Sequence, residues 1–315
     1  MPSAFEWLRD RVSPPTDRQR DAAPDMEERC REIRERPRTV TLPDGRDLGY
    51  AACGDPDGDP LVVFHGFPNS RVFGALFDAA GREHGIRVLA PERPGLGVSD
   101  PDPGRTLLDW PADVAAFLDA LNVDRAPVLG VSGGGPYALA CAHETPDRTP
   151  RVGVAVGLAP VSSVGLRDSL PFLLARVVPP LVRLQLYRDG RQSRDDPEAA
   201  LAERAEMAAP ADGDYWRGEI GRTLLESGLE ARRQGNGPLV DELAIYGRPW
   251  GFDLGAIDVP VALWYGRDDR IVPVEMGFHL ARAIPTAESH FYPDLGHVST
   301  VERNEATIVR WLLDR

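Results

Sequence analysis

A serine framed by glycines constrains the fold of this 315-residue chain more than any other feature of its sequence. Residues 128–137 read Val-Leu-Gly-Val-Ser-Gly-Gly-Gly-Pro-Tyr, so an apolar run typical of a buried strand breaks at Ser132 and resumes in a helical pattern. Residues 130–134 fit Gly-x-Ser-x-Gly, in which the serine occupies a strained strand-to-helix turn with its hydroxyl pointing outward. The pattern predicts that Ser132 is a nucleophile. Because five residues are a weak signal in a chain with 31 glycines, the flanking segments have to decide.

Apolar runs typical of strands alternate with helical stretches on both sides of this serine, and such alternation favours a mostly parallel sheet flanked by helices. The expected strands are residues 39–42, 47–52, 61–64, 86–90, 126–131, 152–158, 259–265 and 289–292. The expected helices are residues 72–83, 107–121, 132–142, 274–283 and 301–313. A turn at Pro43-Asp-Gly45 joins the first two strands and predicts an opening hairpin.

The alternation stops after Pro160, and the next 95 or so residues have helical character without a convincing strand. We interpret residues 161–255 as a helical cap inserted into a core made of residues 37–160 and 256–315. Residues 1–36 end in a run of alternating charges, which predicts a solvated helical extension packed on the outside or exchanged with a partner. The aromatic residues Trp216, Tyr246, Trp250 and Phe252 lie in or near the cap, where they either cover a substrate pocket or pack in its core.

A serine hydroxyl is a poor nucleophile at neutral pH, so it needs a base within hydrogen-bond reach and a third group to orient that base. Residues 265–273, Tyr-Gly-Arg-Asp-Asp-Arg-Ile-Val-Pro, place two acids, Asp268 and Asp269, in the turn after a strand. The loop after the next strand contains His297. We expect His297 to be the base, and we expect structural roles for the remaining histidines, which are His65, His84, His143, His279 and His290.

Together these segments resemble the α/β-hydrolase fold superfamily over nearly all of residues 38–315, with a cap after the sixth strand and the order serine, acid, histidine. The matching motifs are His65-Gly-Phe67, residues 130–134, Gly266-Arg-Asp-Asp269 followed by Ile271-Val-Pro273, and Gly296-His297. The resemblance implies an α/β-hydrolase fold, a mostly parallel central sheet with flanking helices and an inserted helical cap. It places the catalytic acid at Asp269 rather than Asp268. It also implies an oxyanion hole made by the backbone N–H groups of Phe67 and Gly133, with a structural role for His65.

Composition excludes several classes of function. The formal net charge of −13 argues against nucleic-acid binding, which needs a basic face, and all 36 basic residues are arginine. The three cysteines are far apart, so we expect neither a disulfide framework nor a metal site, and a reducing cytoplasm is the simplest setting. No segment has the length and apolar character of a membrane span. Arg93 and Asp100, in a glycine-containing loop that lacks phosphate-binding motifs, are expected to form an ion pair.

These observations predict a cofactor-independent serine hydrolase that cleaves a small-molecule carboxylic ester through Ser132, His297 and Asp269. One alternative is an aminopeptidase resembling the proline iminopeptidases, in which Glu198, Glu203, Glu206, Asp212 or Glu219 of the cap would hold a substrate ammonium. Those enzymes carry tryptophan after the serine, whereas this chain has Gly133. A slow-hydrolysing ligand receptor of the same fold, carbon–carbon bond hydrolysis and perhydrolysis also stay open, as does assembly into a homo-oligomer.

Overall fold

The computed structural model describes residues 25–314 and contains one eight-stranded sheet with the order β1-β2-β4-β3-β5-β6-β7-β8. Strand β2 runs antiparallel to β1 and β4, and all other neighbouring pairs are parallel. The strands are β1 (Arg38–Thr41), β2 (Asp47–Gly54), β3 (Asp59–Phe64), β4 (Ile86–Pro91), β5 (Val128–Val131), β6 (Val152–Ala155), β7 (Val261–Gly266) and β8 (Ala287–Tyr292). The expected hairpin is the β1–β2 pair, and the mostly parallel sheet confirms the predicted fold class.

Side chains that alternate along the central strands build two cores, one on each face of the sheet. In β3, Val62 and Phe64 face one core, and Leu61 and Val63 face the other. The first core is closed by α4 (Trp110–Ala120), α5 (Gly135–Glu144) and α12 (Val274–Ala283). The second is closed by α2 (Met26–Glu35), η1 (Arg71–Phe77) and α13 (His297–Leu312), with α3 (Asp78–His84) following η1. A sheet covered on both faces explains the uninterrupted apolar runs of its parallel strands.

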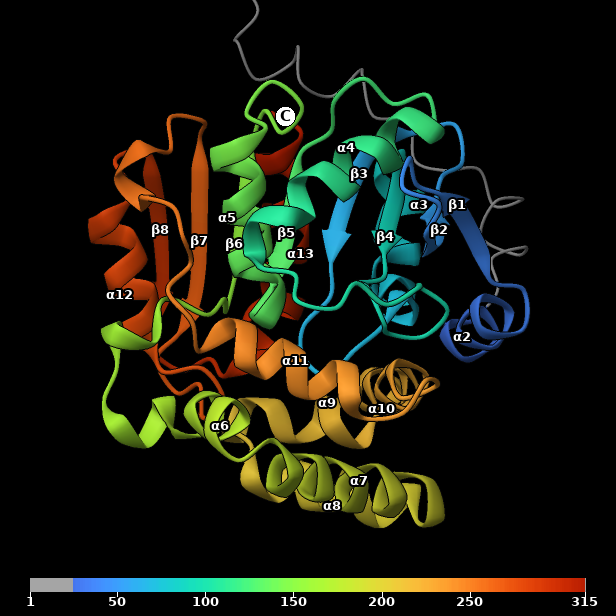
Figure 1. Ribbon diagram of the computed structural model, residues 1–315, viewed down its shortest axis with the longest axis vertical. Coiled ribbons are helices and arrows are strands. Elements are labelled where there is room, and N and C mark those ends of the chain that lie inside the picture. The colour runs from blue at the N-terminus through green and yellow to red at the C-terminus, as the bar shows by residue number, and fades with distance from the viewer. Residues whose placement is uncertain (1–24, 315) are drawn as a thin grey trace, which may run out of the picture.

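All regular elements between β6 and β7 are helices, as the sequence predicted for residues 161–255. Its helices are α6 (Leu166–Val177), α7 (Pro179–Asp195), α8 (Pro197–Met207), α9 (Gly213–Arg217), α10 (Glu219–Ala231) and α11 (Gly237–Tyr246). Single 3-10 turns occur at η2 (Leu107–Asp109), η3 (Ser132–Gly134), η4 (Val161–Ser163), η5 (Pro210–Asp212) and η6 (Leu254–Ala256). Figure 1 shows α6 to α11 gathered beyond the end of the sheet toward which the β3 arrow points. We call residues 161–255 the helical layer, and its status as a separate domain stays a prediction.

Several element boundaries differ from the sequence prediction by two to four residues, and two of them have a clear cause. Strand β6 ends at Ala155 rather than 158, because Val156 has a left-handed φ of 47° and leaves the ladder. Helix α13 begins at His297, four residues earlier than expected, because the carboxylate of Asp212, outside the helix, accepts the N–H groups of its first turn. The charged extension includes helix α2, which packs against η1 and α10, whereas residues 1–24 of that prediction lie outside the described part of the chain.

None of the helices in the described part of the chain has by itself the length and apolar composition of a membrane span, although the bent pair α6 and α7 meets that criterion jointly.

Candidate active site

Ser132 sits at the end of β5 in a backbone conformation that side chains rarely adopt, with a φ of 54°. The turn is compressed from both sides. A Cβ atom on Gly130 would lie 2.6 Å from the carbonyl oxygen of Gly134, and one on Gly134 would overlap the carbonyl oxygen of Phe64. Both positions therefore require glycine, and the compressed turn leaves the Ser132 side chain at the wall of a cavity with 8% of the residue exposed.

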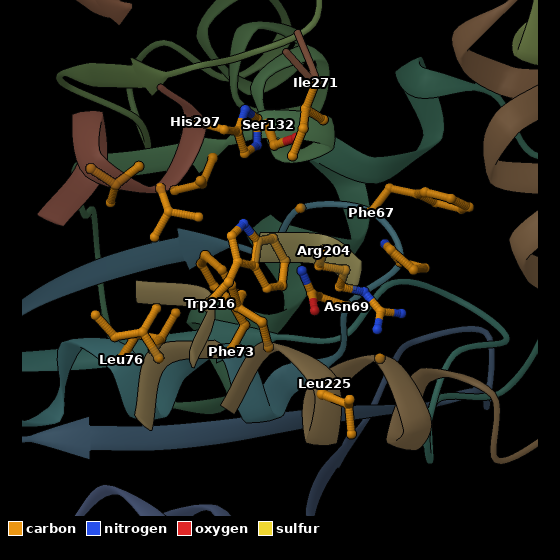
Figure 2. A pocket seen from close by; sticks show the side chains of 18 of the residues that line it. Phe67, Asn69, Phe73, Leu76, Ser132, Arg204, Trp216, Leu225, Ile271 and His297 are labelled. Atoms are coloured by element: carbon orange, nitrogen blue, oxygen red, sulfur yellow. The ribbon is translucent and has the colours of Figure 1, made fainter. Parts of the chain in front are cut away.

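His297 and Asp269 come together from the loops after β8 and β7. His297 Nδ1 lies 2.7 Å from Asp269 Oδ2, and the Asp269 side chain is fully buried. The other carboxylate oxygen accepts the backbone N–H groups of Ile271 and Val272 at 2.8 and 2.9 Å, which fixes the carboxylate against its own turn. The neighbouring Asp268 is exposed. Figure 2 shows the His297 ring beside Ser132, and both residues line the same cavity.

A third acid holds the start of the helix that carries His297. Asp212 comes from the helical layer and is 1% exposed. Its Oδ2 accepts the backbone N–H groups of His297 and Val298 at 2.7 and 3.2 Å. Its Oδ1 accepts two hydrogen bonds from Ser299, one from the backbone N–H at 2.8 Å and one from the hydroxyl at 2.6 Å. A Cβ on Gly296 would lie 2.5 Å from Asp212 Oδ2, so only glycine lets this carboxylate approach. A carboxylate at a helix N-terminus accepts hydrogen bonds from the unpaired N–H groups and interacts favourably with the positive end of the helix dipole.

The electrostatics around His297 favour its protonated form. Burial alone would lower the pKa of His297, but the nearby carboxylates of Asp269 and, to a smaller degree, Asp212 outweigh it and leave the pKa raised above its ordinary value. A histidine with a raised pKa binds a proton more readily, which suits a group that accepts one during a reaction.

The loop after β3 lies against Ser132. A Cβ on Gly66 would be 3.1 Å from Ser132 Cβ and 3.6 Å from its Oγ, and a Cβ on Gly133 would be 3.2 Å from the backbone nitrogen of Phe67. The backbone N–H groups of Phe67 and Gly133 are therefore neighbours at the serine. Neither donates a hydrogen bond to a group among residues 25–314. Two adjacent free donors are what an oxyanion site requires.

A buried ionic network supports this loop from behind. Arg93 donates to the carbonyl oxygens of His65 and Gly66 at 2.7 and 3.2 Å, and its Nε donates to Glu242 of α11 at 2.6 Å. The expected ion pair between Arg93 and Asp100 is wrong, since Asp100 instead accepts the backbone N–H of Asp47. His65 is fully buried, and burial followed by repulsion from Arg93 holds its pKa well below the ordinary range. His65 is thus a neutral structural residue, as the resemblance implied.

Glu242 gathers the rest of the network. Besides Arg93 it binds Arg105, and it accepts the hydroxyls of Tyr137 and Tyr246 at 2.9 and 2.8 Å. Burial opposes its charge, but the two arginines prevail and lower the pKa of Glu242 to about 2. The network therefore ties the helical layer to the loop that carries Phe67 and to helix α5 behind Ser132.

The cavity at Ser132 has a volume of about 120 Å³ and lies between the sheet edge and the helical layer. Its wall is mostly apolar and includes Phe67, Phe73, Leu76, Trp216, Ile220, Leu224, Leu225, Val298 and Val301. Of the four aromatic residues considered from sequence, only Trp216 lines it, whereas Tyr246 and Trp250 are buried in the core. Among the described residues no cluster of His, Cys, Asp or Glu is arranged to hold a metal ion, and the three cysteines are buried and free.

Comparison with known proteins agrees with this geometry. Residues 61–310 match the family model described as Alpha/beta hydrolase family. The chain belongs to this family. It is 32% identical to a non-heme chloroperoxidase of Streptomyces lividans over 75% of this chain and 83% of that protein. It is 28% identical to a 2-hydroxy-6-oxononadienedioate/2-hydroxy-6-oxononatrienedioate hydrolase of Cupriavidus pinatubonensis, over 85% of this chain and 91% of the relative.

Solved structures resemble the fold of this family member. A hydrolase from Pseudomonas aeruginosa superposes with a TM-score of 0.66 at 23% identity, covering 89% of this chain and 99% of that one. An esterase from Exiguobacterium antarcticum superposes with a TM-score of 0.59 at 16% identity, covering 87% and 97% of the two chains. The family match and the names of the relatives identify the chain as a hydrolase of the α/β-hydrolase fold.

The structure thus brings together all five residues predicted from sequence, Ser132, His297, Asp269, Phe67 and Gly133. Sequence reasoning missed Asp212 and Glu242. It considered Asp212 only as an acid for a substrate ammonium, and the sequence gives no sign that either side chain turns inward from a charged helical segment.

Proposed function

We propose that this protein is a serine hydrolase that cleaves a small-molecule carboxylic ester without a cofactor. The observation that carries the proposal is the 2.7 Å contact between His297 Nδ1 and the buried Asp269, together with the cavity that His297 and Ser132 both line. In this assignment Asp269 orients the imidazole, His297 is the general base and Ser132 is the nucleophile.

The reaction follows from these positions. Ser132 Oγ attacks the ester carbonyl carbon while His297 Nε2 takes the hydroxyl proton, and the carbonyl oxygen becomes an oxyanion held by the N–H groups of Phe67 and Gly133. Collapse of this intermediate breaks the carbon–oxygen bond, and His297 returns the proton to the leaving alcohol. Water then attacks the acyl-enzyme through the same base and releases the acid.

Two reagents test this assignment. A panel of p-nitrophenyl esters of increasing acyl length reports turnover, and a fluorophosphonate that labels activated serines is mapped to its residue by mass spectrometry. Ser132→Ala is expected to lower kcat by about a thousandfold or more while the fold stays intact. The matched control is Ser162→Ala, at an exposed serine of the helical layer outside the cavity. Labelling at a residue other than Ser132, or unchanged turnover in Ser132→Ala, refutes the assignment.

A second candidate function is hydrolysis of a carbon–carbon bond, which uses a similar triad. It is favoured by several relatives that are named as hydrolases of 2-hydroxy-6-oxo unsaturated acids, at 27–29% identity. Absorbance loss of a 2-hydroxy-6-oxo dienoate, measured beside the ester panel, decides between the two. Faster turnover of the dienoate than of every ester favours the second candidate.

The aminopeptidase alternative finds less support in the cavity. None of the five cap acids considered for a substrate ammonium lines it, and Asp212 is occupied by the first turn of α13. A receptor role would show itself as slow turnover with ligand binding that survives Ser132→Ala.

A further inference from the structure

The cavity has a polar part set apart from the serine. Its wall includes the side chains of Asn69, Ser193, Arg204 and Arg232, whereas the surfaces around them are mostly apolar. Figure 2 shows Arg204 and Asn69 away from Ser132 and His297. Polar groups placed in an otherwise apolar pocket are those that orient a ligand and select it.

The two arginines share a single carboxylate. Asp189 accepts Arg204 at 3.2 Å through one oxygen and Arg232 at 2.7 Å through the other. The Arg232 side chain is only 6% exposed, and its Nε–H has no acceptor. Burial, together with repulsion from Arg204 and Arg194, lowers the pKa of Arg232, which indicates that Asp189 does not compensate the positive charge around it.

Asn69 provides a second, independent sign of a ligand. The residue is 8% exposed and lines the cavity, and within residues 25–314 its backbone N–H bonds the Gly66 carbonyl oxygen while its side-chain amide makes no hydrogen bond. Asn69 follows Phe67 by two residues, so a group bound at Asn69 is held on the same loop as the backbone N–H of Phe67. The amide atoms of Asn69 are not among the fully buried side-chain atoms without a partner, so they face the open space of the cavity, where a ligand can bond them.

We propose that Arg204, Arg232 and Asn69 bind a carboxylate of the substrate, so that the preferred esters carry one anionic group remote from the scissile carbonyl, as monoesters of dicarboxylic acids do. This inference rests on the proposed ester hydrolysis at Ser132. The guanidinium groups of Arg204 and Arg232 share the single carboxylate of Asp189, so this wall of the cavity keeps positive charge that can bind a substrate carboxylate. The planar fork of arginine fits a carboxylate bidentately, and an amide N–H adds a further donor.

The test compares two substrates that differ by one methyl group, which removes the negative charge: mono-4-nitrophenyl adipate and its methyl ester, methyl 4-nitrophenyl adipate. We expect kcat/KM to be higher for the anionic ester in the wild-type protein. In Arg204→Gln the anionic-to-neutral ratio of kcat/KM is expected to fall about tenfold or more, the usual loss when a hydrogen bond to a charged group is removed. The circular dichroism spectrum and Tm of the variant serve as the control for its folding.

Arg222→Gln is the matched control, because Arg222 lies on α10 but is 57% exposed and outside the cavity. This change is expected to leave the ratio unaltered, and Arg232→Gln should lower it as Arg204→Gln does. A wild-type ratio at or below one, or a ratio that Arg204→Gln and Arg222→Gln change equally, overturns the inference.

Calorimetric titration of adipate into the Ser132→Ala protein separates this inference from the proposed function. Binding that is lost in the Ser132→Ala/Arg204→Gln protein supports the carboxylate site even if no ester is turned over, and in that case the proposed function alone fails. Turnover of the neutral ester without a preference for the anionic one leaves ester hydrolysis standing and refutes the carboxylate site.

Discussion

Asp212→Asn is the substitution that most directly tests how the helical layer controls His297. It removes one negative charge while keeping nearly the same shape at a residue that is 1% exposed. One of the two carboxylate oxygens becomes an NH₂ group. Because each oxygen now accepts two donors of the first turn of α13, the new amide must face N–H groups that it cannot bond.

The size of the effect follows from these contacts. Loss of one or two buried hydrogen bonds to a charged acceptor costs roughly 1.5–3 kcal/mol each, and loss of the charge at a helix N-terminus adds about 0.5–1 kcal/mol. Since such terms are not additive, we expect Asp212→Asn to lower the free energy of unfolding by about 2–4 kcal/mol. Urea unfolding followed by circular dichroism measures this value.

The same substitution should weaken His297 as a base. With Asp212 neutralised, burial opposes the remaining attraction to Asp269 more effectively, so the pKa of His297 falls. Ester turnover requires neutral His297, and the acid limb of kcat/KM is therefore expected to move to lower pH in the variant. A raised histidine pKa contributes stability that is full below about pH 6.5 and is lost as the pH rises through the folded value. The loss of stability in Asp212→Asn should therefore be larger at pH 5.5 than at pH 8.5.

Asp214→Asn is the matched control, since Asp214 lies two residues away and its side chain is fully exposed. An unchanged acid limb in Asp212→Asn, a shift toward higher pH, or a destabilisation no larger than that of Asp214→Asn refutes the reasoning.

Two further predictions concern buried acids. Glu242→Gln leaves Arg93 and Arg105 without their shared counter-charge, so we expect a loss of about 3–5 kcal/mol in the free energy of unfolding and slower ester turnover, because Arg93 holds the Phe67 loop. Unfolding in urea and initial rates on one ester measure both. Burial and the nearby Glu305 raise the pKa of Glu302 to about 7, so its ionisation opposes folding increasingly as the pH rises from about 4.3 to 7. Glu302→Gln is therefore expected to raise Tm more at pH 8 than at pH 5, and an equal change at both values contradicts this account.

The parts of the site that could be predicted from sequence are those that follow parallel strands. Ser132, Asp269 and His297 come after β5, β7 and β8, and the carboxyl ends of neighbouring parallel strands meet at one edge of the sheet. The strand pattern alone therefore predicts that these three residues lie close together, without any knowledge of side-chain packing. In the sequence, only a motif identified Asp269 rather than Asp268 as the candidate acid. In the structure, burial distinguishes the two, because the Asp269 side chain is buried and Asp268 is exposed.

The contacts of the helical layer could not be predicted from the sequence in this way. Arg93 pairs with Glu242, which is 149 residues further along the chain, and the sequence suggested the nearby Asp100 instead. Which face of a charged helix turns inward depends on where the helices cross, and the spacing of charges along residues 161–255 does not determine that. For the same reason Arg204 and Arg232 could not be assigned to the cavity before their positions were known.

The sheet and the helical layer contribute different groups to the candidate site. The segments that follow the sheet strands carry Ser132, His297 and the backbone N–H groups of Phe67 and Gly133, the groups that the proposed ester hydrolysis needs. The helical layer supplies Arg204 and Arg232 at the polar part of the cavity, and it also supplies Asp212 at the base of His297. If the proposed function and the carboxylate site are correct, substrate selection and the strength of His297 as a base both depend on the same segment. A substitution that shifts the helical layer should alter substrate preference and the acid limb of the pH profile together, whereas one confined to the sheet edge should alter the rate alone.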